Sequence, residues 1–254
     1  MNILTYKNKR LLKFNVLEQI SFVEHAFSTR DFGNLGLHVG DIKENVIENR
    51  KLFADSLDID YKKLVSAKQV HGNNVVRVNM EDIGKGSTDY EESIENCDAL
   101  ITDVPNLPLF AFYADCVPIF IVDPDKKAVG LVHSGWKGTL NNIVGNVIDA
   151  FIKEFASHPS DLIAVIGPHI CMECYEVSND IIEKFRDDGY LKVTDSVNQL
   201  DLGKIINNQL SDKGLKRIEQ ENCCTSCDLD MFYSHRKEFG KTGRMAGIIM
   251  IKGD

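Results

Sequence analysis

Residues 109–139 read LFAFYADCVPIFIVDPDKKAVGLVHSGWKGT, and this stretch decides the fold. It contains three short apolar runs, Leu109–Tyr113, Val117–Val122 and Ala128–Val132, each of a length typical of a β-strand. Because several of these runs lack polar alternation, they predict strands in a sheet that is covered on both faces.

The turn between the second and third runs, residues 123–127, reads DPDKK. Proline at the second position suits a type I turn and excludes type I′, so a two-residue hairpin loop is not expected. A four-residue loop pairs Asp123 with Ala128 and keeps Cys116 and His133 on one face, whereas a three-residue loop with a bulge would change that parity. Same-face neighbours across a hairpin lie about 5 to 8 Å apart, close enough for a shared metal ion or a proton transfer.

The flanking sequence alternates strand and helix patterns without a strict βαβ rhythm, which predicts a mixed α/β or α+β fold. Leu64–Met80 is expected to form two strands around a turn at residues 71–74, and an exposed acidic loop should follow over residues 81–96. Further strands are expected at Asp98–Thr102, Leu162–Ile166 and Gly247–Ile251, and amphipathic helices at Leu140–Phe155, Ser178–Arg186 and Leu202–Leu210. Thr139 is expected to cap the first helix, whose buried stripe would be Ile143, Val147, Ile148, Phe151 and Ile152. No linker composition separates two halves, so residues 1–254 are predicted to form a single domain.

Composition narrows the classes of function. The 254 residues are 43% hydrophobic, which is ordinary for a globular protein and excludes disorder and coiled coil. With 29 Lys and Arg against 38 Asp and Glu, the net charge of −9 argues against nucleic-acid and membrane partners. Any anionic substrate would have to be bound by a few cationic residues in a cleft. The first 20 residues do not resemble a signal peptide and no apolar run reaches 18 residues, so a cytoplasmic protein with reduced thiols is expected.

Cys116 and His133 are the candidate reactive residues of the central hairpin. They stand at predicted strand ends, beside Asp115 and Lys137, which are poor core residues. His71, at another junction of strand and turn, supplies a candidate third ligand, and two histidines with one cysteine suit a catalytic zinc site with an open fourth position. The alternative is an inert core cysteine beside a hydrogen-bonded histidine.

Five further cysteines form a second group. Cys171 and Cys174 are spaced Cys-x-x-Cys, as are Cys224 and Cys227, with Cys223 adjacent. Such pairs can make a four-thiolate zinc site, but the spacing alone is only moderately specific. We expect these cysteines to be reduced, with no second zinc at Cys223, Cys224 and Cys227, because spacing fixes no fourth ligand for them.

Taken together, the motifs carry a family resemblance over nearly the whole chain. The blocks, in order, are His25–Arg30, Gly40–Arg50, Gln69–Gly72, Asp98–Leu100, Ala114–Cys116, His133–Thr139, Ile166–Val177, Cys224–Cys227, and Phe232, Ser234, Arg236 and Thr242–Arg244. In this combination the chain resembles the YfiH-like laccase-domain family, first described as polyphenol oxidases and later as purine nucleoside phosphorylases.

The resemblance implies an α/β layered sandwich of mixed sheets flanked by helices, similar to the catalytic domains of cytotoxic necrotizing factors. It implies metal ligands at His71, Cys116 and His133, with zinc, or else copper, as the cofactor. The implied reactions are phosphorolysis of adenosine, inosine and methylthioadenosine, and deamination of adenosine. The partners would then be a nucleoside and phosphate.

Candidate roles follow for the residues around the metal ligands. Cys116, His133 and Asp115 are the candidate catalytic residues, Asp115 being the carboxylate nearest in sequence for proton transfer. Substrate contacts are expected from Gln69 in the QVHG block and, for the phosphate, from the cations Arg50, Lys137 and Arg244. The sequence departs from the family pattern at residues 235–240, in a shortened segment after Gly33 and at Cys171, and these departures leave fine specificity open.

Two other reactions stay open. Copper-based phenol oxidation is disfavoured, because multicopper oxidases need about ten histidines, largely in His-x-His pairs. This chain has seven histidines and no such pair. A cysteine hydrolase, with Cys116 as nucleophile and His133 as base, for example on peptidoglycan precursors, would use the same two residues as the metal site.

Overall fold

The central hairpin organises the structure. The computed structural model describes residues 1–189 and 198–253, and in it β8 (Val117–Asp123) pairs antiparallel with β9 (Ala128–Ser134). Asp123 lies opposite Ala128, so the connecting loop has four residues, which is the first of the two lengths considered from the sequence. Pro118 lies opposite His133. Cys116 is two residues before Pro118, so it lies on the same face of the hairpin as His133.

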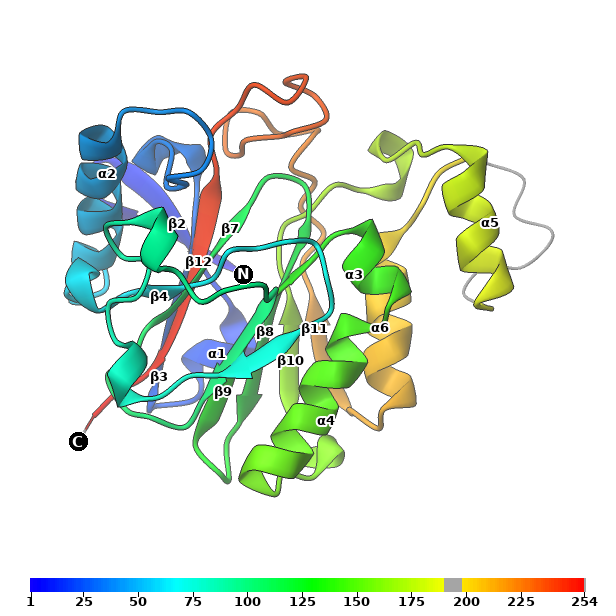
Figure 1. Ribbon diagram of the computed structural model, residues 1–254, viewed down its shortest axis with the longest axis horizontal. Coiled ribbons are helices and arrows are strands. Elements are labelled where there is room, and N and C mark those ends of the chain that lie inside the picture. The colour runs from blue at the N-terminus through cyan, green and yellow to red at the C-terminus, as the bar shows by residue number, and fades with distance from the viewer. Residues whose placement is uncertain (190–197, 254) are drawn as a thin grey trace.

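The strands form two six-stranded mixed sheets, and this hairpin lies at the centre of one of them (Figure 1). The hairpin sheet has the order β11-β10-β8-β9-β6-β5, with β5 at Val75–Arg77, β6 at Ala99–Thr102, β10 at Ile163–Ile166 and β11 at Arg217–Gln220. The second sheet has the order β1-β2-β3-β12-β7-β4. Its strands are β1 (Asn2–Tyr6), β2 (Lys9–Lys13), β3 (Val23–Ser28), β4 (Val65–Ser66), β7 (Leu109–Tyr113) and β12 (Met245–Ile251).

Strand alternation divides the core into three apolar layers. Between the sheets, side chains of β7 and β12 such as Tyr113 and Ile249 meet Phe120 and Leu131 of the hairpin. At Gly247 of β12 a side chain would stand 2.9 Å from the Phe120 ring, so a glycine is needed for this close approach.

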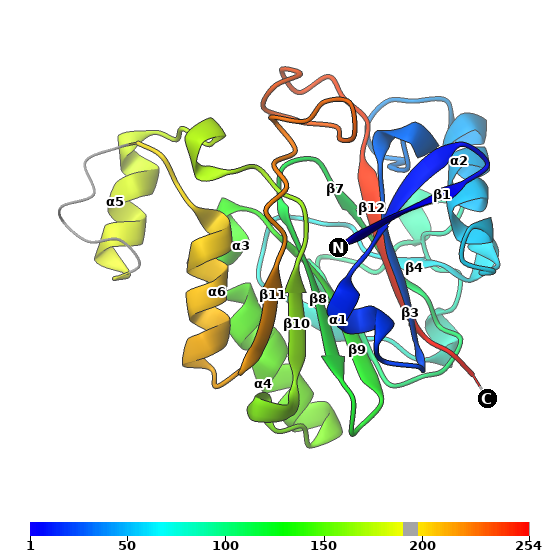
Figure 2. The same ribbon diagram turned by 180° about the vertical axis from the view of Figure 1, so that it is seen from behind.

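Helices cover the two outer faces, as the views from the front and from behind show (Figures 1 and 2). On the second sheet, α2 (Lys43–Asp55) packs its buried Phe53 and Ala54 against that sheet. On the hairpin sheet lie α4 (Ile143–Phe155) and α6 (Leu202–Asp212). Helix α5 (Asn179–Asp187) lies to the side of these helices, away from the sheet, and its buried Ile182 and Phe185 join the same apolar cluster (Figures 1 and 2). The described residues also form two short α-helices, α1 (Asn15–Glu18) and α3 (Trp136–Leu140). The mixed α/β class expected from the sequence is therefore confirmed.

Several details differ from the sequence-based expectations. Thr139 does not cap the long helix: it lies inside α3, where its hydroxyl pairs with that of Ser134 at 2.8 Å. Asn142, in the left-handed conformation, caps α4 instead and accepts a hydrogen bond from the N–H of Gly145 at 3.1 Å. The expected stripe on α4 is right for four residues, but Ile152 is 42% exposed.

The two strands expected in Leu64–Met80 exist, but they are only β4 and β5 and belong to different sheets. The intervening segment carries the chain from one sheet to the other. Strands β1, β2, β3 and β11 and helix α2 were not anticipated, because their apolar residues are interrupted by charged ones.

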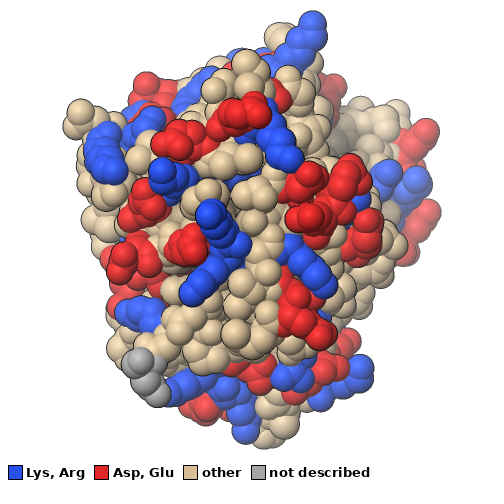
Figure 3. All heavy atoms as spheres, turned by 60° about the vertical axis from the view of Figure 1, so that its left-hand side comes forward, with Lys and Arg blue, Asp and Glu red and all other residues tan. Residues whose placement is uncertain are grey.

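Charges of both signs are mixed on the face that carries α2. Figure 3 shows Lys and Arg side chains interspersed there with Asp and Glu. Lys43, the first residue of α2, pairs with Asp89 at 2.9 Å. None of the described helices is both long and apolar enough to span a bilayer.

One buried histidine makes the stability depend on pH. His25, on β3, is 1% exposed, and its Nε2 accepts the main-chain N–H of Phe14 at 2.8 Å, which requires a neutral ring. Burial, with a smaller effect of Lys13, lowers its pKa from 6.5 to about 3. Below its unfolded pKa the unfolded chain therefore takes up a proton at His25 that the folded protein does not, and stability is lost as the pH falls.

We predict that His25→Gln reduces this loss, because an amide oxygen can accept the Phe14 N–H without titrating. Between about pH 7.5 and 4.5 the free energy of unfolding of the variant should fall by roughly 2 to 3 kcal/mol less than that of the wild type. Urea titrations at several pH values measure the difference. His158→Gln, on an exposed histidine, is the control and should follow the wild type; equal slopes for all three proteins would contradict the prediction.

Candidate metal centre

His71, Cys116 and His133 converge at the end of the central hairpin. One potential ligand atom from each lies within 4.8 Å of the others. The two imidazole rings meet edge to face, with centroids 4.9 Å apart and an interplanar angle of 81°. His133 is 4% exposed, Cys116 is half-buried and His71 is exposed, so the trio opens toward solvent on the His71 side.

Local structure explains how each side chain reaches this point. Cys116 and His133 share a face because of the hairpin register. His71 has φ +60°, a left-handed conformation in the segment between β4 and β5. Three successive N–H groups of that segment, those of Val70, His71 and Gly72, donate to the Asp98 carboxylate at 3.2, 3.0 and 2.7 Å.

Asp98 also orients His133. Its Oδ1 lies 2.9 Å from His133 Nδ1. Nε2 is therefore the nitrogen of that ring that can bind a metal ion. A carboxylate behind a ligating histidine fixes the orientation of the ring and raises its basicity. Asp98 lies in the Asp98–Leu100 block recognised from the sequence, where it was given no role. The available signal was an acidic residue immediately before a fully buried strand.

The trio is strongly polarised. Burial would raise the pKa of the Cys116 thiol, but His133 and His71 outweigh it and lower that pKa to about 6. Burial lowers the pKa of His133, yet the neighbouring Cys116 and Asp98 raise it to about 9. The protein without metal therefore favours a thiolate paired with an imidazolium, and a metal ion would displace the His133 proton on binding.

The donor set fits a metal ion. Two imidazole nitrogens and a sulfur that is already biased to the thiolate are the ligands that zinc prefers, with one position left over. Space is also reserved for the site, because a Cβ at Gly135 would stand 3.0 Å from Cys116 Sγ and 3.1 Å from His71. Any side chain at residue 135 would crowd both ligands.

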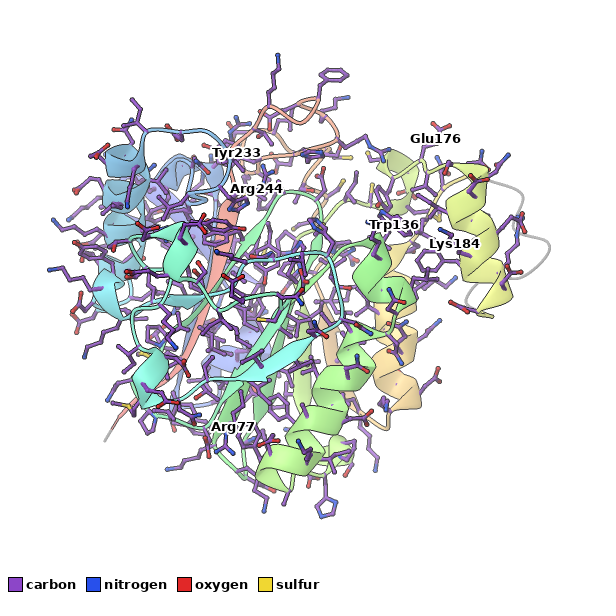
Figure 4. All side chains as sticks on the ribbon, in the orientation of Figure 1. Arg77, Trp136, Glu176, Lys184, Tyr233 and Arg244 are labelled. Carbon is purple, nitrogen blue, oxygen red and sulfur yellow. The ribbon has the colours of Figure 1, made fainter. Side chains whose placement is uncertain are left out.

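A cavity of about 410 Å³ adjoins the trio, and its walls come from both sheets and from the long connections. Phe112 and His38 lie on the side of the second sheet, and Trp136 of α3 and Tyr175 on the other side. Figure 4 shows Arg244, next to β12, and Trp136 at the two sides of this region. The cavity thus combines aromatic walls with a cation and the metal ligands.

Two of the four predicted substrate residues line the cavity. Arg244 does so, with Nη1 fixed by the carbonyls of Thr242 and Gly243 at 3.0 and 2.9 Å. Gln69 also does so, but its amide is occupied by both main-chain groups of Phe112, at 2.9 and 2.8 Å.

The other two predicted substrate residues are not part of the cavity lining. Arg50 is 1% exposed, and its Nε and Nη1 donate to the carbonyls of Leu35, Gly86 and Ser87. Burial lowers the pKa of Arg50 to about 9, and these contacts favour a structural role. Lys137 is exposed on α3, with Nζ 5.6 Å from the centre of the Trp136 ring.

Asp115 lies at the cavity, but both of its carboxylate oxygens are engaged. Oδ1 accepts the Thr225 hydroxyl at 2.7 Å, and Oδ2 accepts the N–H of Arg236 at 2.7 Å. Its φ is +84° and its carbonyl accepts the N–H of Ile170 at 3.1 Å. These contacts join three loops next to Cys116 and favour a positioning role over direct proton transfer.

Some residues of the cavity were not assigned roles from the sequence. His38, Tyr175 and His235 line it, and so does Arg236, whose guanidinium lies 5.1 Å from the centre of the Tyr175 ring. They come from loops that are distant in sequence. The available signal was that Tyr175 and Arg236 lie in family blocks, and that His38 and His235 lie in segments that depart from the family pattern.

The second cysteine group also differs from expectation. The sulfurs of Cys171, Cys174, Cys224 and Cys227 lie within 4.8 Å of one another, and Cys223 is not part of the cluster. Spacing alone did not show which thiols come together, and the fold supplies Cys171 and Cys174 as partners of Cys224 and Cys227.

The stacking of two sheets around a central hairpin recurs in known proteins. The chain matches the family described as multi-copper polyphenol oxidoreductase laccase over residues 23–252, and it belongs to this family. A crystal structure of Bacillus licheniformis protein YfiH superposes with a TM-score of 0.88 at 36% identity, covering 92% of this chain and 95% of that one. The family resemblance inferred from the motif blocks is thereby confirmed.

Two similar proteins are named as purine nucleoside phosphorylases. The protein named purine nucleoside phosphorylase YlmD from Bacillus subtilis is 37% identical over 227 residues, which cover 86% of this chain and 82% of the relative. The protein of the same name from Geobacillus stearothermophilus is 34% identical, covering 85% of this chain and 82% of the relative. A crystal structure of YlmD from that species superposes with a TM-score of 0.87 at 31% identity, covering 92% of this chain and 93% of that one.

We predict that Asp98→Asn weakens metal binding at the trio by about 10- to 100-fold, because an amide cannot both accept the loop N–H groups and hold the His133 ring as a carboxylate does. Competition with a chromophoric zinc chelator measures the affinity, and circular dichroism checks the fold. Asp103→Asn removes a carboxylate that pairs with Arg77 and does not line the cavity, and it should leave the affinity unchanged. Wild-type affinity in Asp98→Asn would show that the carboxylate does not support the site.

Proposed function

We propose that the chain is a zinc-dependent purine nucleoside enzyme. It would split adenosine, inosine or methylthioadenosine with phosphate into the purine base and a pentose 1-phosphate, and it would also deaminate adenosine. The observation that carries the proposal is the convergence of two histidines and a polarised cysteine beside a cavity with aromatic walls and an arginine. The relatives named purine nucleoside phosphorylase support the choice of substrate.

The residues of the cavity suit the two substrates of this reaction, a purine nucleoside and phosphate. Aromatic side chains, Trp136, Tyr175 and Phe112, offer apolar faces on which a purine can stack. Arg244 and Arg236 supply guanidinium donors, which bind phosphate by charge-assisted hydrogen bonds. In phosphorolysis a phosphate oxygen bonds to C1′ as the bond from C1′ to the purine nitrogen breaks, and that nitrogen takes up a proton.

His71, Cys116 and His133 would hold the zinc, which supplies Lewis-acid activation of an oxygen ligand when bound. Asp98 binds both the His133 ring and the His71 main chain, and so positions both residues next to Cys116. Asp115 ties the loops of Thr225 and Arg236 against the same point. The protein thus contributes positioning and charge complementarity, which are large parts of catalysis in general.

Zinc is proposed over copper because the ligands are too few for multicopper chemistry. Among the described residues the candidate metal clusters are this trio and the four-cysteine group. Neither supplies the set of about ten histidines that multicopper oxidases require. The seven free thiols fit a reducing compartment, so we also propose a cytoplasmic location.

A thiol hydrolase is the second candidate, and one observation favours it. Asp98, His133 and Cys116 form a chain in which the carboxylate holds the imidazole and the imidazole contacts the sulfur. This is the arrangement of a cysteine nucleophile with its base and orienting group. His71 has no function in such a mechanism, which is why we rank it second.

We predict that Cys116→Ala and Cys116→Ser each lose one zinc per chain together with inosine phosphorolysis. The loss of rate should exceed the roughly 10- to 100-fold that removal of an outer partner causes, because neither variant keeps a thiolate at the site. Zinc content and phosphate-dependent release of hypoxanthine are measured on the same samples. Cys223→Ser, a cysteine outside both clusters, is the matched control and should keep both. Full activity in metal-free Cys116→Ala would end the proposal. If the metal-free wild type is active and a thiol-alkylating reagent inactivates it, the hydrolase is favoured instead.

We predict that Arg244→Gln raises the KM for phosphate by about 10- to 100-fold and changes the KM for inosine much less. A hydrogen bond between charged groups contributes about 1.5 to 3 kcal/mol, which corresponds to a change of this size. Lys137→Gln removes a cation that is exposed and does not line the cavity, so it should leave both constants near the wild-type values. A larger effect in Lys137→Gln than in Arg244→Gln would reverse the assignment of the phosphate site.

A further inference from the structure

Two Cys-x-x-Cys pairs lie on neighbouring loops at one end of the hairpin sheet. Cys171 and Cys174 follow β10, and Cys224 and Cys227 follow β11. Because β10 and β11 are parallel neighbours, both loops leave the sheet at the same end. The pairing continues beyond the strands, since the N–H of His169 donates to the Cys223 carbonyl and the N–H of Thr225 to the His169 carbonyl, each at 3.1 Å. The backbone itself therefore brings the two pairs together.

We propose that Cys171, Cys174, Cys224 and Cys227 bind one zinc ion as a four-thiolate structural site, separate from the His71, Cys116 and His133 centre. The four sulfurs lie within 4.8 Å of one another, and Cys174 and Cys227 approach to 3.4 Å. Bonds of about 2.3 Å in a tetrahedron place sulfurs about 3.8 Å apart, so small side-chain adjustments suffice. Four sulfur ligands in two Cys-x-x-Cys pairs are typical of structural zinc.

Main-chain N–H groups are directed at the sulfurs. The N–H of Cys171 donates to Cys224 Sγ at 3.2 Å, which links one pair to the other. Within the pairs, the N–H of Cys174 contacts the Cys171 sulfur and that of Cys227 the Cys224 sulfur. Four thiolates around a divalent ion leave a net charge of −2, and such hydrogen bonds stabilise it. The loops thus carry donors suited to the bound state.

Cys223 provides an internal contrast. It is adjacent to Cys224 in sequence, yet it packs against the apolar layer between the two sheets and is not among the clustered sulfurs. Of the three cysteines in this loop, only Cys224 and Cys227, which have the Cys-x-x-Cys spacing of metal ligands, belong to the cluster.

A zinc ion here would brace one wall of the nucleoside cavity. The loop of Cys171 and Cys174 carries Ile170 and Tyr175, both of which line the cavity. The loop of Cys224 carries Thr225, whose hydroxyl bonds to Asp115 beside Cys116. Joining the two loops through a metal would hold these residues in place without contact between the ion and the substrate.

The test counts zinc in protein purified under reducing conditions. We expect two zinc ions per chain in the wild type, one in Cys224→Ser, one in Cys116→Ala and two in Cys223→Ser. Cys227→Ser, at the exposed member of the cluster, provides a second variant if Cys224→Ser fails to fold. Cobalt-substituted Cys116→Ala should show thiolate-to-cobalt charge-transfer absorption and the visible bands of a tetrahedral ion, and Cys224→Ser should lose the part due to the cluster.

The results separate this inference from the proposed function. One zinc in both the wild type and Cys116→Ala, lost in Cys224→Ser, would support the four-thiolate site and contradict a zinc at the trio. One zinc in the wild type and none in Cys116→Ala would overturn the inference. Iron in place of zinc, or a disulfide between Cys174 and Cys227 in the purified protein, would also overturn it.

Discussion

The Asp98 carboxylate is the contact on which the candidate site depends. It is 2% exposed, and it joins the N–H groups of the His71 segment to the His133 ring. A buried carboxylate is stable only when it is fully hydrogen-bonded, and here the neighbouring histidine and main-chain donors satisfy it. The contacts that stabilise Asp98 in the interior are therefore the same contacts that bring His71 to His133 and Cys116. Stability and ligand geometry cannot be varied independently at this residue.

The features that the sequence predicts well are those set by short-range chemistry. The proline turn excluded a two-residue loop and left loops of three or four residues open. The structure has the four-residue loop, and its register places Cys116 and His133 on one face of the hairpin. The apolar strands of the hairpin sheet were recognised for a similar reason, since burial on both faces leaves a continuous apolar run. His71, in contrast, could be named as a ligand only as a residue type at a turn, and the family blocks strengthened that choice.

The features that the sequence did not predict depend on contacts between distant residues. Threonine often caps helices, but the hydroxyl of Thr139 is hydrogen-bonded to that of Ser134, and Asn142 caps α4 instead. Arg50 was interpreted as a phosphate-binding cation within a family block, but its partners are carbonyls from loops that only the fold brings near. The convergence of two cysteine pairs some fifty residues apart needs the parallel pairing of β10 with β11, which no local pattern encodes.

The crossing of the chain between the sheets at His71 has a consequence for folding. β4 belongs to one sheet and β5 to the other, whereas Cys116 and His133 both belong to the hairpin. The hairpin forms from residues close in sequence, so two ligands can assemble early, while the third arrives only when β5 and β6 have joined the hairpin and Asp98 binds the His71 segment. An intermediate with a formed hairpin but without these outer strands would have two ligands of the trio in place and lack the third. Complete ligation would thus follow the addition of the outer strands to the hairpin sheet.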